Sequence, residues 1–279
     1  MACPRLVPLL VVLALGCKSS EAHGVAPAAT SAAGASSSAA LSPATPSPAT
    51  PSPAPPPAGV VYPWGPTSSS RLDERFRAPP LGFQRVNVAP GSFGELLRAL
   101  PLQPVGAPVV DHRGRKLHDD GQSPNIVAVA DLDVGSKDLQ HCADVIVRLH
   151  AEWRYGRGQR DLQYRSVSGR ALSYQGYLLG DRAVADGRDI ALRRAAPARR
   201  DDHAAFREWL DEVFAWAGTA SLERDARKVA GLAEIQPGDF FVMSGAPFGH
   251  AVLVLDVARD ERGRVALLLG QSYMPAQSF

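Results

Sequence analysis

Residues 18–60 constrain the fold most, because they are rich in alanine, serine, proline and threonine and almost free of charge. From Pro43 a five-residue pattern repeats as PATPS, PATPS and PAPPP. Such a segment buries too little apolar surface to offset the entropy lost on ordering, and its prolines favour an extended polyproline conformation. We therefore expect a disordered, semi-stiff linker over 18–60 and a single globular domain over 61–279.

The residues before this linker have the features of an export signal. Arg5 precedes the apolar run 6–15, which is shorter than the about 20 residues that a helix needs to cross a bilayer. The sequence LALGC over 13–17 resembles the end of a bacterial lipoprotein signal peptide. This resemblance implies a signal peptide over 1–17, lipid attachment at Cys17, and a membrane anchor in the cell envelope. An ordinary signal peptide is the alternative.

Charge indicates which partners to expect. The chain has 30 Lys and Arg against 28 Asp and Glu, a balance that is not typical of a nucleic-acid-binding protein. Lys18 follows the expected anchor, where an aspartate would retain a lipoprotein at the inner membrane. We therefore expect export to the periplasmic side, with the outer membrane favoured.

Cysteine usage singles out one thiol. The chain has three cysteines, of which Cys3 would be removed with the signal and Cys17 would be acylated. Cys142 would then be the free thiol of the mature protein, and an intramolecular disulfide would be impossible. A lone thiol in an oxidising compartment is a liability unless it is buried or used.

Hydrophobic periodicity predicts the elements of the globular part. Helices are expected over 93–100, 139–153, 202–217 and a short stretch after residue 221. Strands are expected over 109–110, 126–134, 239–243, 251–257 and 265–270. Ser136 or Asp138 is expected to cap the second helix, which would place Cys142 inside it. The last three strands form an antiparallel meander, so the fold class is α+β, with helices packed on a mostly antiparallel sheet.

Three polar side chains can meet at this meander. His250 opens its central strand directly after Gly249, and Gln271 follows the next strand. Cys142 lies on a helix that can pack against the sheet. A thiol, an imidazole and an amide that orients the ring are the parts of a cysteine nucleophile site.

Two short segments carry a family resemblance. Residues 236–241, QPGDFF, and 249–254, GHAVLV, resemble the C-terminal half of the papain-like cell-wall peptidases and amidases of the NlpC/P60 and CHAP families. The resemblance implies a papain-like arrangement in which Cys142 is the nucleophile, His250 the base and Gln271 the third residue.

Over nearly the whole globular length, the chain resembles a bacterial family known only as domain of unknown function 4846. The segments that carry this resemblance are 91–98, 138–144, 249–252 and 271–277, the last of which reads QSYMPAQ. Members of that family usually continue past this segment, so the resemblance implies that residues beyond Phe279 are missing.

Each candidate residue also has a purely structural interpretation. Cys142 can be a small core residue, His250 can bind a neighbouring carbonyl, and Gln271 can satisfy a sheet edge. Gln140 is a candidate oxyanion donor and Asp138 a helix cap. Four further residues resemble metal ligands only in type, and their spacing favours a solvated hairpin loop: His112, His118, Asp119 and Asp120.

The sequence therefore leaves two functions open. The first is an envelope-tethered papain-like cysteine hydrolase or transferase, which acts on an amide or acyl bond of a substrate such as peptidoglycan peptide. The second is a non-catalytic envelope lipoprotein that binds a wall fragment or a partner protein. Neither needs a cofactor or a metal, and the oligomeric state stays open.

Overall fold

The structure is a computed structural model that describes residues 12–14, 70–117, 125–245 and 249–279. The chain divides into two units, 1–16 with 59–279, and 17–58. The second unit, which holds Cys17 and nearly all of the expected linker, lies outside the described residues. No helix among the described residues is both long and apolar enough to cross a bilayer.

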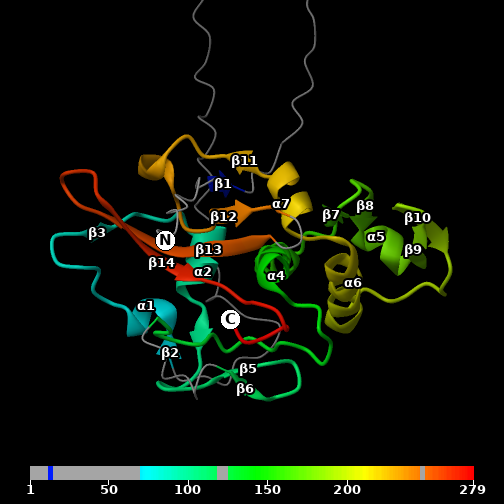
Figure 1. The fold of residues 1–279 in the computed structure, drawn as a ribbon, viewed down its shortest axis with the longest axis horizontal. Helices are drawn as coiled ribbons and strands as arrows, with labels where there is room; N and C mark the ends of the chain where they lie inside the picture. Colours follow the sequence, from blue (N-terminus) through cyan, green and yellow to red (C-terminus); the bar gives the residue numbers. More distant parts are fainter. Residues whose placement is uncertain (1–11, 15–69, 118–124, 246–248) are drawn as a thin grey trace, which may run out of the picture. The chain divides into compact units, whose positions relative to one another are not determined.

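The described residues form a mixed α/β fold, in which every paired strand is antiparallel (Figure 1). The largest sheet has the order β11-β1-β12-β13-β14, and β3 pairs with β13. Its strands are β1 (Val12–Ala14), β3 (Gln84–Arg85), β11 (Arg227–Lys228), β12 (Phe240–Met243), β13 (His250–Arg259) and β14 (Val265–Gly270). The consecutive strands β12, β13 and β14 confirm the predicted C-terminal meander.

Strand β1 comes from the apolar run that the sequence assigns to a signal peptide. Its three residues pair with β11 on one side and β12 on the other. A chain that began at Cys17 would lack this strand, and the facing backbone groups of β11 and β12 would be free to bind water or another strand.

Four of the helices, α2, α4, α6 and α7, lie where helices were predicted, whereas α1, α5 and η1 were not predicted. They are α1 (Leu72–Arg75), α2 (Phe93–Arg98), α4 (Cys142–Gly156), α5 (Tyr174–Leu178), α6 (His203–Trp216), α7 (Thr219–Asp225) and the 3-10 turn η1 (Leu232–Glu234). Ser92 caps α2 by accepting the Glu95 N–H, and Asp202 caps α6 by accepting the Ala205 N–H. Both caps satisfy amides that the helix itself leaves unpaired.

Helices α2 and α4 both pack on β13. Ile146 and Leu149 of α4 are fully buried in the same core cluster as Ala251 and Leu253 of β13. Burial of side chains of this size contributes roughly 1.5–3 kcal/mol each. The packing fixes α4 against the first half of β13.

Four two-stranded sheets complete the fold. They are β2 (Ser70–Arg71) with β4 (Pro101–Leu102), β5 (Val109–Val110) with β6 (Lys116–Leu117), β7 (Gln163–Arg165) with β8 (Ala171–Ser173), and β9 (Asp181–Asp186) with β10 (Asp189–Arg194). The last two sheets lie within residues 160–195, an Arg- and Gly-rich stretch in which the sequence pattern does not define individual strands.

The strand predicted over 126–134 is wrong. The segment is extended, but its backbone pairs with two different neighbours rather than with one strand. The Gln103 N–H donates to the Val129 carbonyl, whereas the Ala130 N–H donates to the Phe279 carbonyl. Alternating apolar residues therefore mark a partly buried segment that lies between β4 and the C-terminal end of the chain.

The predicted start of α4 is also wrong, because the helix begins at Cys142 and not at Leu139. His141 is the N-cap residue, and its N–H donates to the carboxylate of Asp144 at 3.0 Å. Leu139 continues the apolar stripe, but its carbonyl accepts the His141 N–H in a turn before the helix. Neither Ser136 nor Asp138 is the cap.

A buried guanidinium fixes the turn that leads into α4. The Arg148 side chain is fully buried and donates to the carbonyl and the carboxylate of Asp133 and to the Gln140 Oε1 at 2.6 Å. Its Nε lies 3.7 Å from the carboxylate of Glu152, which is also fully buried. The turn over 133–140 is thereby attached to the middle of the helix that it precedes.

We predict that Arg148→Met lowers the free energy of unfolding by about 3–5 kcal/mol, because it leaves the buried Glu152 carboxylate without its arginine. The matched control is Arg165→Met, which removes a surface pair with Asp225 at 3.5 Å and should cost less than about 1 kcal/mol. Urea unfolding of the full chain measures both. Equal losses in the two variants would contradict the role given to Arg148.

Candidate functional site

The thiol of Cys142 lies at the N-terminal end of α4, against the start of β13. The residue is 8% exposed, and the backbone N–H of Ala251 is near enough to favour its thiolate. Burial raises the pKa of the thiol, and the nearby carboxylate of Asp144 acts in the same direction. The N–H groups of Ala251 and Ala143 oppose this shift, as amides at a helix start favour a thiolate.

The neighbour of Ala251 in β13 is His250, whose ring is held from one side. Its Nε2 lies 2.7 Å from the Oε1 of Gln271. Because an amide oxygen accepts, this contact places the ring proton on Nε2 and leaves a lone pair on Nδ1. Nδ1 is buried and has no hydrogen-bond partner among the described residues. The ring of Tyr273 packs edge-on at 5.4 Å between centroids.

Glycine is required directly before this histidine. A Cβ on Gly249 would lie 2.5 Å from the carbonyl oxygen of Met243 and would also collide with the side chain of Thr219. The Gly-His pair that drew attention in the sequence therefore has a steric cause, since β12 and α7 approach the start of β13 closely.

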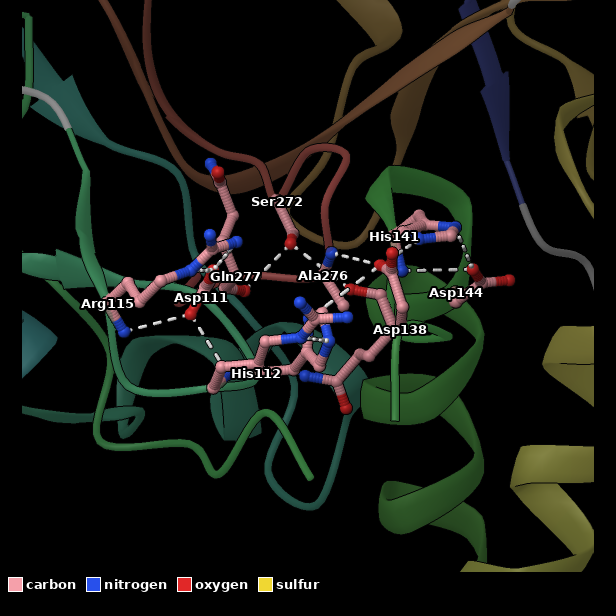
Figure 2. A network of polar contacts seen from close by, with 11 residues as sticks. Asp111, His112, Arg115, Asp138, His141, Asp144, Ser272, Ala276 and Gln277 are labelled. Carbon is pink, nitrogen blue, oxygen red and sulfur yellow. Dashed lines mark hydrogen bonds and ion pairs between the residues drawn. The ribbon is translucent and has the colours of Figure 1, made fainter. Parts of the chain in front are cut away.

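The C-terminal segment after β14 is fastened to the residues before α4. The hydroxyl of Ser272 donates to the carbonyl of Gln140 at 3.2 Å, and the N–H of Ala276 donates to Oδ1 of Asp138 at 2.7 Å (Figure 2). These two bonds bring Gln271 to the same end of α4 as Cys142.

The structure thus joins two of the three predicted site residues, because the His250 ring contacts the Gln271 amide. Cys142 lies beside the backbone of Ala251, the residue that follows His250 in β13. Among the described residues no hydrogen bond joins the sulfur of Cys142 to the ring of His250.

Asp138 is the centre of a network beside this site. Its Oδ1 accepts from Ala276, lies 2.9 Å from Nε2 of His141 and 3.9 Å from Nδ1 of His112 (Figure 2). The Ala276 N–H is the main cause that lowers the pKa of Asp138, followed by His141. Asp138 therefore attaches the C-terminal segment to α4 and does not cap the helix.

The expected solvated loop around His112 needs correction. The His112 side chain is 6% exposed, and the backbone N–H of His112 donates to the Ala276 carbonyl at 2.8 Å. Among the described residues no three His, Cys, Asp or Glu side chains are placed to hold a metal ion. His118, Asp119 and Asp120 lie outside the described residues.

A buried aspartate supports the adjacent turn. Burial acts to raise the pKa of Asp111, but hydrogen bonds from Arg115 and Arg113 outweigh it and lower the pKa to about 2. Asp111 also forms an isolated antiparallel bridge with Gln277. The ionised carboxylate therefore stabilises the turn between β5 and β6, and the backbone bridge joins that turn to the C-terminal segment (Figure 2).

Gln140 is not free to bind an oxyanion. Its Nε2 donates to the Asp133 carbonyl at 3.2 Å, and its Oε1 accepts from Arg148. Both ends of the amide are used within the turn before α4. The backbone N–H groups of Cys142 and Ala143 at the start of α4 act to lower the pKa of the thiol, so they favour negative charge at this point.

Asp144 is a residue that the sequence analysis missed. It is 4% exposed, and burial raises its pKa to about 8. One oxygen accepts the His141 N–H, and the other is buried with no partner among the described residues. Asp144 lies three residues after the N-cap, which is the spacing of a capping box. The motif is hard to recognise in the sequence because the N-cap residue is His141 instead of the usual serine or threonine.

We predict that Asp144 makes stability depend on pH. In the folded chain the Asp144 carboxyl keeps its proton up to about pH 8, whereas in the unfolded chain it releases the proton near pH 4. The contribution of the neutral carboxyl to the free energy of unfolding is therefore complete below pH 4 and is lost as pH rises through about 8. The free energy of unfolding should fall by up to about 1.4 kcal/mol per pH unit within this window.

Asp144→Asn should lose this pH dependence and keep the cap, whereas Asp161→Asn, at a side chain that is 78% exposed, should keep it. Urea unfolding at a series of pH values is the measurement. Parallel profiles for the native chain and Asp144→Asn would show that Asp144 is ionised in the folded state.

Comparison with known proteins gives one assignment. Residues 72–279 match the family described as Domain of unknown function (4846). Comparisons with curated proteins and with solved structures find no significant match. The match covers most of the chain, from α1 through the C-terminal segment that carries Gln271, and the chain therefore belongs to the family of domain of unknown function 4846.

Proposed function

We propose that this protein is a papain-like cysteine hydrolase or transferase that acts on an amide or acyl bond of a cell-envelope substrate. The observation that carries the proposal is the pairing at the start of β13: an imidazole oriented by Gln271, with an unpartnered buried Nδ1, beside a helix that begins with Cys142. A nucleophile at a helix start, a base and an orienting amide are the roles that thiol catalysis requires.

The chemistry assigns one role to each residue. Nδ1 of His250 takes the proton of the Cys142 thiol, and the thiolate forms a bond to the substrate carbonyl carbon. The bond from that carbon to the leaving amine or alcohol breaks, and the leaving group takes the proton from His250. Water or an acceptor amine then attacks the thioester and regenerates the thiol. The N–H groups of Cys142 and Ala143 can stabilise the oxyanion.

The resting geometry requires one rearrangement. Nδ1 of His250 has no hydrogen-bond partner among the described residues, so the thiol has to turn toward it before it can react. Catalytic hydrogen bonds are often long or unformed without substrate and form in the complex.

We also propose that the protein is exported and anchored in the envelope by a lipid on Cys17, with the outer membrane favoured by Lys18. The support is the apolar run 6–15, the LALGC sequence and the long linker over 18–60. An anchor followed by a linker would let the domain reach peptidoglycan peptides or other envelope substrates at a distance from the membrane.

One observation favours the alternative, a non-catalytic envelope lipoprotein that binds a wall fragment or a partner protein. Cys142 is buried, and burial raises the pKa of its thiol, as expected for an inert core cysteine. The reactivity of the thiol separates the two functions.

We predict that iodoacetamide alkylates Cys142 in the folded full chain and that alkylation accelerates with rising pH, because the pKa of the thiol is raised. His250→Ala should slow alkylation by about 100-fold, since no base then accepts the thiol proton. Peptide mass spectrometry quantifies Cys142 separately from Cys3 and Cys17. Alkylation in urea but not in the folded chain would establish the non-catalytic alternative.

We predict that Gln271 is a positioning residue. Gln271→Ala should slow Cys142 alkylation by about tenfold and change its pH profile, because the His250 ring loses the acceptor that fixes its proton on Nε2. Gln271→Glu, which retains an acceptor oxygen, should restore most of the rate. The control is Gln159→Ala, which removes a surface bond to Arg154 and should leave the rate unchanged. Equal rates in Gln271→Ala and Gln159→Ala would exclude the role.

A further inference from the structure

A cavity of about 490 Å³ lies beside the proposed site. Its walls come from α1 and the residue after it, β4, β5, the extended segment 125–130, β13, β14 and the C-terminal residues. This volume is within the range of small-molecule sites, roughly 300–1,000 Å³.

The side chains that line the cavity are mostly apolar. None of the described residues that line it is charged, and most are aliphatic, with Phe76 and Phe279 as aromatic members. Two large apolar side chains of the lining are exposed to solvent, Val127 at 63% and Leu269 at 46%. These two residues mark a part of the wall that reaches the surface.

One residue joins this cavity to the proposed catalytic groups. Gln271 lines the cavity, and its Oε1 is the acceptor that holds His250. Beyond it, Tyr273 and Met274 are 54% and 42% exposed, and the Tyr273 ring packs on His250. Gln271 therefore links the edge of the cavity to the ring that would serve as the base.

We propose that this cavity binds the hydrocarbon chain of a long-chain acyl group, and that the acyl carbonyl lies at the Gln271 edge, within reach of the turned thiol of Cys142. The inference rests on the proposed function and specifies its substrate class. The acyl group would form a thioester with the Cys142 sulfur, the leaving amine or alcohol would depart with the proton from His250, and water or an acceptor amine would release the acyl group.

The wall chemistry favours a hydrocarbon chain over a peptide. A peptide segment brings an N–H and a C=O for every residue, and each polar group buried without a partner costs roughly 1–3 kcal/mol. The polar lining residues are few: Asn125, Gln271, Gln277 and Ser278. A hydrocarbon chain has no polar group to satisfy, and its burial contributes about 0.8 kcal/mol per methylene.

Binding is tested without turnover on full-length Cys142→Ser with the fluorescent probe dansyl-undecanoic acid. We expect saturable binding that laurate displaces and butyrate does not, because affinity should grow with the buried chain. Leu269→Glu and Val127→Glu should each weaken the probe by at least about tenfold, since each places a carboxylate at the exposed wall. Leu192→Glu, at a residue that is 41% exposed on β10 and does not line the cavity, should leave affinity unchanged.

The outcomes separate this inference from the proposed function. Absence of saturable binding, or equal displacement by laurate and butyrate, overturns the acyl site even if Cys142 reacts with iodoacetamide. If Leu192→Glu weakens probe binding as much as Leu269→Glu does, the acyl site is also overturned, because the probe would then bind to the protein surface without specificity. Saturable binding with an unreactive Cys142 supports the acyl site and overturns the proposed catalysis alone.

Discussion

The buried guanidinium of Arg148 determines where the central helix begins. It takes the carbonyl and carboxylate of Asp133 and the amide oxygen of Gln140, so the chain before α4 is folded back along the helix. A buried charge is stable only when its partners are complete, and a displaced turn would take the Asp133 carboxylate away from the buried Arg148 guanidinium. The helix start at Cys142 is thus fixed from inside the protein.

The C-terminal segment depends on this same turn. Ser272 donates to the Gln140 carbonyl and Ala276 donates to Asp138, so both attachments use groups that Arg148 and its neighbours position. The segment then passes Phe279, whose ring lies so close to Gly270 that a Cβ there would collide with it. The path that brings Gln271 to His250 is therefore also the path that closes one wall of the cavity.

Elements that are stabilised by interactions between residues close together in the sequence could be predicted from the sequence. The meander β12-β13-β14 was predictable because alternating apolar residues and the turn at 260–263 lie within one stretch of sequence, and the hydrogen bonds of Asp260 confirm that turn. The caps Ser92 and Asp202 were predictable for the same reason. The grouping of Cys142, His250 and Gln271 was predictable only as a pattern of residue types.

The features that the sequence concealed have long-range causes. The apolar stripe extends back to Leu139, but the helix begins only at Cys142. The contacts of Arg148 with the preceding turn and the cap from Asp144 set this start. The segment 126–134 alternates like a strand, but its partners are a strand near residue 102 and the chain end near Phe279, which no local pattern reveals. His112 looked solvated because its cover comes from the C-terminal segment around Ala276.

Burial of the thiol and use of the thiol are compatible if substrate changes the environment of Cys142. A protonated thiol is a poor nucleophile and also a poor target for oxidants, which would protect Cys142 in the oxidising compartment that the proposed export implies. The carboxyl of Asp144, which burial keeps neutral up to about pH 8, adds no negative charge beside the sulfur at lower pH. A thiolate formed on demand by His250 would then face the helix-start amides without an opposing charge. The same burial that makes Cys142 look inert therefore leaves its activation to the imidazole.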